Sequence, residues 1–458
     1  MDPLLQDAMT RAARYREAVA LDPIRPEPDS DLGELSGDFP EGPTDPAEVL
    51  RLIDEVGSPA TMGFSNPRFY GWVIGGVYPV ALAADWLVSA WDQNTYAAVA
   101  TPATVALEGT AVRWIIQALG LPESAWGVFV TGTTVAHVTA LAAARSSVLA
   151  TEGWDATSQG LFGAPPVTVV VGEEVHPSLL KALGIVGLGR ERVVRVPVDD
   201  QGRMRPDALP DLAPPAIVCL QAGNVNSGAV DPMSELIPQV KEMGAWVHVD
   251  GAFGLWAAAA PSLAHLTTGV ELADSWATDA HKYLNVPYDA GLALVRNSSD
   301  LERVMSVAAS YLVEGEIGLD PGLYAPEMSR RARGVPTWAI LKCLGRSGLA
   351  ELIERTHRMA VRFAAAMEDA GFEVLNDVVL NQVLVSFGEP DETLAIIEKV
   401  QEEGVMFAGP TVWQGRTAMR VSVSHFATEE DDVDRSVAAL LRAAARLGRL
   451  SAPGPKDP

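Results

Sequence analysis

A repeating pattern between Trp126 and Asn297 constrains the fold of this chain more than any other feature. Short apolar runs alternate there with segments of helical periodicity. The runs read WGVFVT, PVTVVVGEE, AIVCLQAG, AWVHVDGA and AGLALVRN, and their apolar residues occupy both faces. Such strands are typical of a parallel sheet covered by helices on both sides. The sequence therefore predicts an α/β domain with a large, mainly parallel sheet, whose functional groups lie at strand ends and in the following loops.

The chain on either side of this pattern predicts three further parts. Residues 1–60 combine two helical patterns with a linker rich in Pro, Asp and Gly, and we expect an N-terminal helical arm. The large domain then covers residues 61–335. Residues 336–450 begin with a long helical stretch and continue through NQVLVSFG and AMRVSVSH, which predicts a smaller C-terminal α+β domain. The tail, 451–458, is expected to be disordered.

Charge and cysteine content exclude several classes of partner. With 59 acidic and 34 basic residues the net charge is -25, so we expect neither nucleic acid nor a membrane surface as partner, since both require a basic footprint. Cys219 and Cys343 form no CxxC motif, which fits a cytoplasmic protein and excludes a thiolate zinc site. The first residues lack the pattern of a secretory signal. The apolar stretch 73–90 contains Pro79 and Asp85, which indicates a turn and a buried helix rather than a membrane span.

Lys282 stands out because DSWATDAHKYLNVPYDAG otherwise reads as buried strand and turn. A buried ammonium costs several kcal/mol unless it is paired or neutralised. Asp250 ends an apolar run 32 residues earlier, where an arbitrary Asp is most often a helix cap or a turn former. Neighbouring strands of one sheet could present both groups at the same edge. A desolvated lysine is a nucleophilic amine, and a buried carboxylate can pair with a protonated ring nitrogen.

Two further motifs suit a phosphate-bearing aromatic cofactor, pyridoxal phosphate. In VFVTGTTVAHVTALAAAR an expected strand runs through Gly132, Thr133 and Thr134 into a helix, so that N–H groups, hydroxyls and a positive helix end converge. Alone, this junction reads as a threonine-rich helix cap, and it is neither a P-loop nor a GxGxxG motif. His176 follows another strand, where a lone histidine is more often a structural hydrogen-bonding group. Beside an aromatic cofactor it could instead stack on the ring and aid proton transfer.

Together these motifs resemble the pyridoxal-phosphate-dependent group II amino-acid decarboxylases, which include the aromatic L-amino-acid, glutamate and histidine decarboxylases. The resemblance runs from about Ser65 to at least Gly345 and includes SNPRFYGW, EEVHPSLLKA, WVHVDGAFG, HLTTGVELADSWATDAHKYL and SRRARGVPTWAILKCLG in the family's order. It implies a PLP-dependent fold type I (aspartate aminotransferase-like) protein that releases the α-carboxylate of an L-amino acid as CO2. It also implies a homodimer with active sites at the interface, embraced by the N-terminal arm.

The resemblance also implies roles for single residues. Lys282 is similar to the Schiff-base lysine, Asp250 to the carboxylate that keeps the pyridine nitrogen protonated, and His176 to the histidine stacked on the ring. The other cofactor-binding positions that it implies are Gly132, Thr133, Thr134, Asn224, Asn226, Ala252, Asp279 and His281. The chain departs from the family where Asp279 replaces an Asn found in several members. It also has His137 where related folds often have Asn or Thr.

A mobile loop at 313–327 corresponds to the family's loop whose tyrosine returns a proton to the substrate's α-carbon. Tyr324 is the candidate, although it lies closer to SRRARG than the family's tyrosine does, and Tyr311 is the second candidate. A phenylalanine in this role is associated with aldehyde formation in the family. Its absence favours simple decarboxylation.

The expected pocket wall includes Trp72 and Ile74, which favours an aromatic or bulky apolar substrate. Core packing is an equally good explanation of Trp72. Arg68 would instead suit an acidic substrate if it pointed inward. Arg420 stands where aminotransferases of this fold type hold the substrate carboxylate, or else it is a surface or interdomain arginine.

Other functions remain open from the sequence. On the same scaffold they are transamination, aldehyde-forming oxidative deamination and carbon–carbon cleavage. A non-catalytic binding subunit is disfavoured because Lys282, Asp250 and His176 are all present. A zinc hydrolase is more remote, because the seven histidines form no HExxH motif. His248 and Asp250 share one strand face by their spacing and read better as a supporting pair for the cofactor, so no metal site is expected.

Overall fold

The computed structural model describes residues 2–21, 23–27, 30–307 and 320–448 and divides into two compact units. The large unit consists of Val77–Arg358 and Asn376–Gln382. The small unit consists of Met1–Gly76, Met359–Leu375 and Val383–Pro458. These divisions fall after Gly76 and Arg358, whereas the sequence predicts boundaries after residues 60 and 335. The predicted tail, 451–458, lies outside the described residues.

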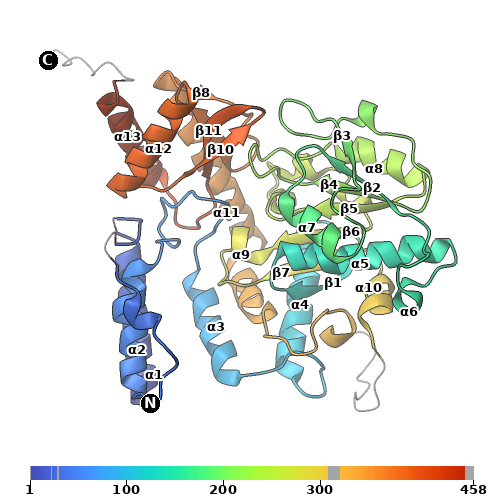
Figure 1. The fold of residues 1–458 in the computed structure, drawn as a ribbon, viewed down its shortest axis with the longest axis horizontal. Helices are drawn as coiled ribbons and strands as arrows, with labels where there is room; N and C mark the ends of the chain where they lie inside the picture. Colours follow the sequence, from blue (N-terminus) through green and yellow to red (C-terminus); the bar gives the residue numbers. More distant parts are fainter. Residues whose placement is uncertain (1, 22, 28–29, 308–319, 449–458) are drawn as a thin grey trace. The chain divides into compact units, whose positions relative to one another are not determined.

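The large unit contains a seven-stranded sheet in the order β1-β7-β6-β5-β4-β2-β3 (Figure 1). Its strands are β1 (Trp126–Val130), β2 (Thr168–Gly172), β3 (Val194–Val196), β4 (Ala216–Gln221), β5 (Trp246–Asp250), β6 (Ser275–Asp279) and β7 (Gly291–Val295). Only β7 runs against its neighbours, β1 and β6, so the sheet is mainly parallel. The predicted α/β class is confirmed, and all five apolar runs form strands.

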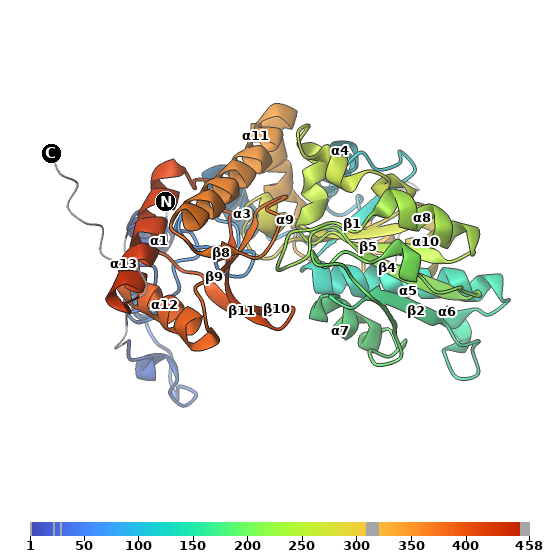
Figure 2. The ribbon, with the colours of Figure 1, turned by 90° about the horizontal axis from the view of Figure 1, so that it is seen from above.

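Helices cover both faces of this sheet. Figure 2 shows α5 (Thr133–Thr151) and α7 (Pro177–Ile185) on one face and α8 (Met233–Glu242) on the other. The unit's remaining α-helices are α3 (Pro79–Trp91), α4 (Pro102–Ala118), α6 (Ala156–Gln159), α9 (Ala280–Tyr283) and α10 (Ser298–Met305). Its short helices are η4 (Pro206–Ala208), η5 (Gly254–Ala259), η6 (Ala264–Thr267), η7 (Val270–Leu272) and η8 (Pro321–Leu323).

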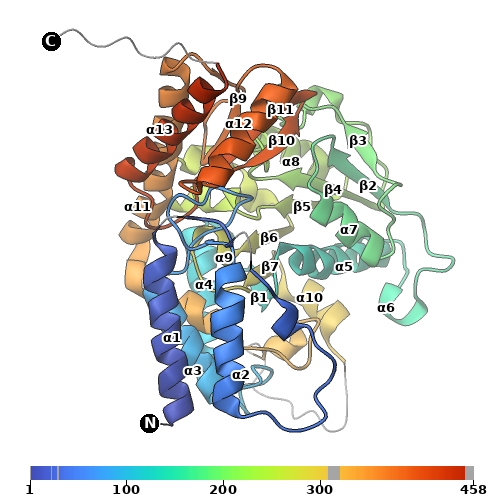
Figure 3. The same cartoon turned by 60° about the vertical axis from the view of Figure 1, so that its left-hand side comes forward.

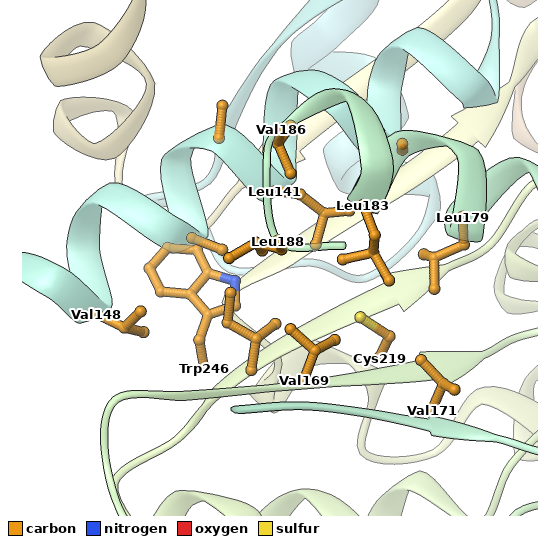
Figure 4. Packing of buried hydrophobic residues seen from close by; sticks show 14 residues of the cluster. Leu141, Val148, Val169, Val171, Leu179, Leu183, Val186, Leu188, Cys219 and Trp246 are labelled. Carbon is orange, nitrogen blue, oxygen red and sulfur yellow. The ribbon is translucent and has the colours of Figure 1, made fainter. Parts of the chain in front are cut away.

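A buried apolar cluster fixes α5 and α7 on the sheet (Figure 4). Side chains of the two helices pack there on strands β2, β4 and β5, and the labelled members include Leu141, Leu179, Leu183, Val169, Val171, Cys219 and Trp246. Full burial of one such aliphatic side chain stabilises the fold by about 1.5–3 kcal/mol. This packing positions the first residues of both helices, where Thr133 and His176 stand.

The small unit contains a second sheet in the order β10-β11-β9-β8. Its strands are β8 (Glu373–Val374), β9 (Gln382–Ser386), β10 (Gly409–Trp413) and β11 (Arg416–Ser422), and its later helices are α12 (Pro390–Glu403) and α13 (Glu430–Arg446). The N-terminal helices are α1 (Pro3–Val19), α2 (Pro46–Leu52), η1 (Gly33–Leu35), η2 (Ile53–Gly57) and η3 (Ser58–Ala60). Figure 3 shows α1 and α2 side by side, and Arg11 Nη1 donates to Asp54 Oδ2 at 2.8 Å.

One long helix, α11 (Gly334–Asp369), belongs to both units, and Gly345 interrupts its helical backbone with φ 60°. None of the described helices is long and apolar enough to cross a membrane.

Candidate active site

Lys282 lies in α9, the four-residue helix that directly follows β6. Its Nζ is 3.0 Å from Oδ2 of Asp279, the last residue of β6. The Lys282 side chain is 21% exposed and that of Asp279 is 3% exposed. The ammonium is therefore largely buried and paired with a carboxylate three residues earlier, which offsets part of the cost of its burial.

Asp279 connects this lysine to the first residue of α5. Its Oδ1 accepts a hydrogen bond from the Thr133 backbone N–H at 2.7 Å, and its Oδ2 lies 3.5 Å from His281 Nε2. Burial alone would raise the pKa of Asp279, but the charges of Lys282 and His281 hold it below its usual range. Asp279 is therefore a carboxylate at neutral pH, and it lies at the helix start where the sequence predicts a phosphate.

The turn before α5 has the features of an anion cradle. Thr133 Oγ1 is buried and has no hydrogen-bond partner among the described residues, which is costly for a hydroxyl. Thr134 is half-buried. Gly132 packs so closely on Gly291 that a Cβ at position 291 would lie 2.5 Å from Gly132 Cα. The first turn of a 19-residue helix thus holds free hydrogen-bonding capacity beside Asp279.

Asp250, the last residue of β5, is 7% exposed. Its Oδ1 accepts from the Ala252 N–H at 3.2 Å, and its Oδ2 lies 3.4 Å from His137 Nε2. Burial opposes ionisation, but His137, His176 and Lys282 outweigh it and hold the pKa of Asp250 below its usual range. The structure thus brings Lys282, Asp250 and His176 into one electrostatic environment, with an ionised carboxylate at the strand end.

Two histidines extend the site into the core. His137 Nδ1 lies 2.9 Å from His248 Nε2, and His248 Nδ1 lies 2.8 Å from Ser275 Oγ. Burial and the neighbouring His137 lower the pKa of His248 to about 3, so His248 is neutral. The sequence paired His248 with Asp250, but in the structure His137 lies between them. The spacing of four residues from Thr133 puts His137 on the same face of α5, and this was the signal that could have placed it.

The remaining predicted cofactor residues make local hydrogen bonds. His176 Nδ1 accepts from the Ser178 N–H at 3.3 Å and contacts Ser178 Oγ at 2.7 Å, so it caps α7. Asn224 Oδ1 accepts from the N–H groups of Asn226 at 2.8 Å and of Ser227 at 3.2 Å, which shapes its own turn. Asn224 and Asn226 are both buried.

Tyr324 packs in the apolar cluster around β1 and β7. Its ring is 4% exposed and packs on Trp126, with ring centroids 6.4 Å apart. Trp126 begins β1, whereas Gly132 and Thr133 follow the end of that strand. The second candidate, Tyr311, and residues 313–319 of the predicted loop lie outside the described residues.

Trp72 and Ile74 belong to the small unit. Trp72 is 53% exposed and stacks on Phe69 and Phe407, with centroids 6.0 Å and 5.7 Å away. Ile74 is half-buried. Trp72 therefore packs on aromatic rings of its own unit, while about half of its surface stays exposed in that unit.

Two arginines of the small unit were weighed as substrate ligands. Arg68 is 2% exposed, its Nη1 pairs with Asp432 at 2.8 Å, and its Nε donates to the Val405 carbonyl at 2.9 Å. Its guanidinium is thus engaged in the core of its own unit. Arg420 lies on β11, where burial lowers its pKa from the usual value.

Comparison with known proteins gives consistent results. The model of the "Pyridoxal-dependent decarboxylase conserved domain" matches residues 32–388. An aromatic-L-amino-acid decarboxylase of Bacillus atrophaeus is 29% identical over 397 residues, covering 83% of this chain and 80% of that protein. The acidic amino acid decarboxylase GADL1 of Xenopus tropicalis is 30% identical over 325 residues, covering 68% and 63%. The crystal structure of Oryza sativa TDC with PLP and tryptamine has a TM-score of 0.89 at 23% identity and covers 97% of each chain, a likeness of fold.

Proposed function

Because the chain belongs to the family of pyridoxal-dependent decarboxylases, we propose that the cluster of Lys282, Asp250 and His176 removes the α-carboxylate of an aromatic or bulky apolar L-amino acid as CO2. The product is the corresponding amine. The family match confirms the expected enzyme class, a PLP-dependent carboxy-lyase, and its pyridoxal phosphate cofactor. The assignment of single residues to the reaction is our proposal.

One observation carries this proposal: a buried, ion-paired lysine amine shares its surroundings with an ionised carboxylate at the next strand end. The donor set fits the cofactor. Lys282 supplies an amine for its carbonyl group, Asp250 supplies a negative partner for its ring nitrogen, and the unpartnered Thr133 hydroxyl supplies a donor for its phosphate.

Bound pyridoxal phosphate supplies a carbonyl carbon that condenses with amines and a protonated ring that draws electrons from the substrate's α-carbon. Lys282 would hold the cofactor, and its Nζ could carry a proton when it is free. Asp250 would keep the ring nitrogen protonated. Gly132, Thr133 and Thr134 would bind phosphate, with Asp279 and His281 beside them, while His176 and Ala252 would contact the ring and Asn224 and Asn226 would shape the adjoining loop.

Burial of these groups strengthens their electrostatic effect, because little water screens them. The proton that replaces CO2 on the α-carbon needs a donor. The sequence offers two candidates for this donor: Tyr324, which packs on Trp126, and Tyr311.

The proposed substrate class rests on the resemblance, which implies that Trp72 and Ile74 belong to the pocket wall. Trp72 offers an exposed aromatic face, and Ile74 an apolar one. Arg68, which would favour an acidic side chain, is already paired with Asp432. The named relatives act on aromatic and on acidic amino acids, so family membership alone does not choose between these classes.

Transamination is the second candidate, because Arg420 is a half-buried cation whose burial lowers its pKa, and such a cation suits a retained carboxylate. Our proposal also includes a homodimer, as the resemblance implies, and a cytoplasmic location, as the cysteine content favours.

The test uses the purified holoenzyme with aromatic, aliphatic and acidic L-amino acids labelled in the carboxyl group. Released CO2, amine, aldehyde and keto acid are all measured. We expect CO2 and amine in equal amounts, fastest with an aromatic substrate. Formation of keto acid without release of CO2 would show that the reaction is transamination rather than decarboxylation.

Borohydride reduction followed by peptide mapping tests the lysine assignment. We expect the cofactor on Lys282, and Lys282→Ala should abolish both labelling and CO2 release. Lys241→Ala is the matched control, since Lys241 also pairs with a carboxylate in the large unit, Asp274 Oδ1 at 2.7 Å. Full turnover in Lys282→Ala would refute the assignment.

A further inference from the structure

A line of buried polar side chains leads from the core to Asp250. Trp246 and His248 stand on β5, Ser275 on β6 and His137 on α5. His137, His248 and Ser275 are fully buried, and Trp246 is 9% exposed. Buried polar groups destabilise a fold unless each finds a partner, so such a line needs a consistent set of donors and acceptors.

The donor at the core end fixes the direction of every bond. An indole N–H can only donate, and Trp246 Nε1 donates to Ser275 Oγ at 2.9 Å. Among the described residues, the other partner of this hydroxyl is His248 Nδ1 at 2.8 Å, so the hydroxyl proton finds an acceptor there only if Nδ1 carries no proton. Neutral His248 then carries its own proton on Nε2 and donates to His137 Nδ1 at 2.9 Å.

The acceptor at the other end requires the same direction. Asp250 is ionised and can only accept, and its Oδ2 faces His137 Nε2 at 3.4 Å. With Nδ1 of His137 occupied by His248, its proton is on Nε2. This nitrogen makes no hydrogen bond within the described ranges, and the Asp250 carboxylate at 3.4 Å is the ion-pair partner that it faces. If these hydrogen bonds ran in the opposite direction, the Nε2 lone pair of His137 would face the negatively charged Asp250 carboxylate.

We propose that His137 and His248 are positioning residues that each carry a proton on Nε2, so that His137 directs one N–H at Asp250 and keeps it an oriented carboxylate. Oδ1 is fixed from the other side by the Ala252 N–H at 3.2 Å. The carboxylate thus keeps its remaining lone pairs for the cofactor's ring nitrogen, and this last step rests on the proposed function. The tautomers themselves follow from the protein alone.

The first test is on the cofactor-free full-length chain with isotope-labelled histidine. Solid-state nitrogen NMR at neutral pH distinguishes the two tautomers and the imidazolium, and the variants His137→Phe and His248→Phe assign the two signals. We expect both residues as neutral Nε2–H forms. A cationic His137, or a proton on Nδ1 of either ring, would overturn the proposal.

The second test measures pyridoxal phosphate binding to the same cofactor-free protein by equilibrium dialysis. A hydrogen bond to a charged group is lost in His137→Phe, so we expect binding about 10–100-fold weaker. His137→Gln keeps an N–H at a similar reach and should restore most of the affinity. A purely structural role would instead lower thermal stability equally in both variants without this rescue.

Trp276→Phe is the control for a buried indole, because Trp276 Nε1 donates at 2.9 Å to the Val270 carbonyl outside the line. It should leave both tautomers and cofactor binding within about twofold of wild type. Unchanged binding in a folded His137→Phe would overturn the proposal even if CO2 is released. Correct tautomers in a protein that releases no CO2 would contradict only the proposed function.

Discussion

Asp279→Asn removes one negative charge beside α5 while preserving the shape of the side chain. Asp279 accepts from the Thr133 N–H at 2.7 Å and pairs with Lys282 at 3.0 Å. In our proposal the cofactor's phosphate binds at this same helix start. We therefore expect two opposite effects: tighter pyridoxal phosphate binding and a less stable cofactor-free protein.

The size of each effect follows from the contacts. Two unit charges about 6 Å apart interact by about 3 kcal/mol at an effective dielectric of about 20. Taking the compensation by Lys282 as about half of the repulsion between Asp279 and phosphate, removal of the charge should lower the Kd about tenfold, or about 1.4 kcal/mol. Without cofactor, a charged hydrogen bond at a helix N-terminus becomes neutral, which should lower the free energy of unfolding by about 1–2 kcal/mol.

Equilibrium dialysis gives the Kd, and urea unfolding of the cofactor-free protein gives the stability. Asp274→Asn is the matched control, because Asp274 accepts from the Val247 N–H at 2.8 Å and pairs with Lys241 at 2.7 Å, away from the cradle. It should lose similar stability with no gain in affinity. A Kd that stays the same or rises in Asp279→Asn would refute the placement of phosphate at the start of α5.

Three further predictions concern buried charges. Glu108→Gln should lower the free energy of unfolding by about 3–5 kcal/mol, because the Arg330 side chain is fully buried and pairs with Glu108 at 2.7 Å. In urea unfolding, the double variant Glu108→Leu, Arg330→Met should recover most of this loss. A loss below about 1 kcal/mol in Glu108→Gln would contradict the prediction. Arg68→Met should destabilise the protein without changing the ratio of rates on aromatic and acidic amino acids, since Arg68 pairs with Asp432; a selective loss on acidic substrates would assign it to the pocket. Burial raises the pKa of Asp231 to about 6, so the protonated carboxyl stabilises the fold below about pH 4, and this contribution is lost as pH rises through 6. Over this range the free energy of unfolding of the wild type should fall by about 3 kcal/mol relative to that of Asp231→Asn. Parallel curves of unfolding free energy against pH would contradict the prediction.

Local patterns predicted most of the scaffold. AWVHVDGA indicates a strand buried on both faces that ends at Asp250, because burial on two faces leaves an uninterrupted apolar run in the sequence. The direction of β7 could not be read, since AGLALVRN has the same composition whichever way the strand runs. The units also divide differently from the expectation, because the assignment of residues 61–76 depends on packing against distant segments such as α13.

The site was predictable where one residue acts at a strand end, as Lys282 and Asp250 do. It was not predictable where contacts join distant segments through the rotation of a helix. Asp279 and Thr133 are separated by 146 residues, and His137 and His248 by 111. The position of Tyr324 near the expected loop likewise does not reveal that its ring packs on Trp126.

The close contact between Gly291 and Gly132 limits how this protein can be redesigned. A methyl group at position 291 would lie 2.5 Å from the Gly132 Cα and 2.9 Å from Asp279 Oδ1, so the backbone itself would have to shift. Libraries that diversify the site can vary the side chains around it, but they should leave Gly291 unchanged.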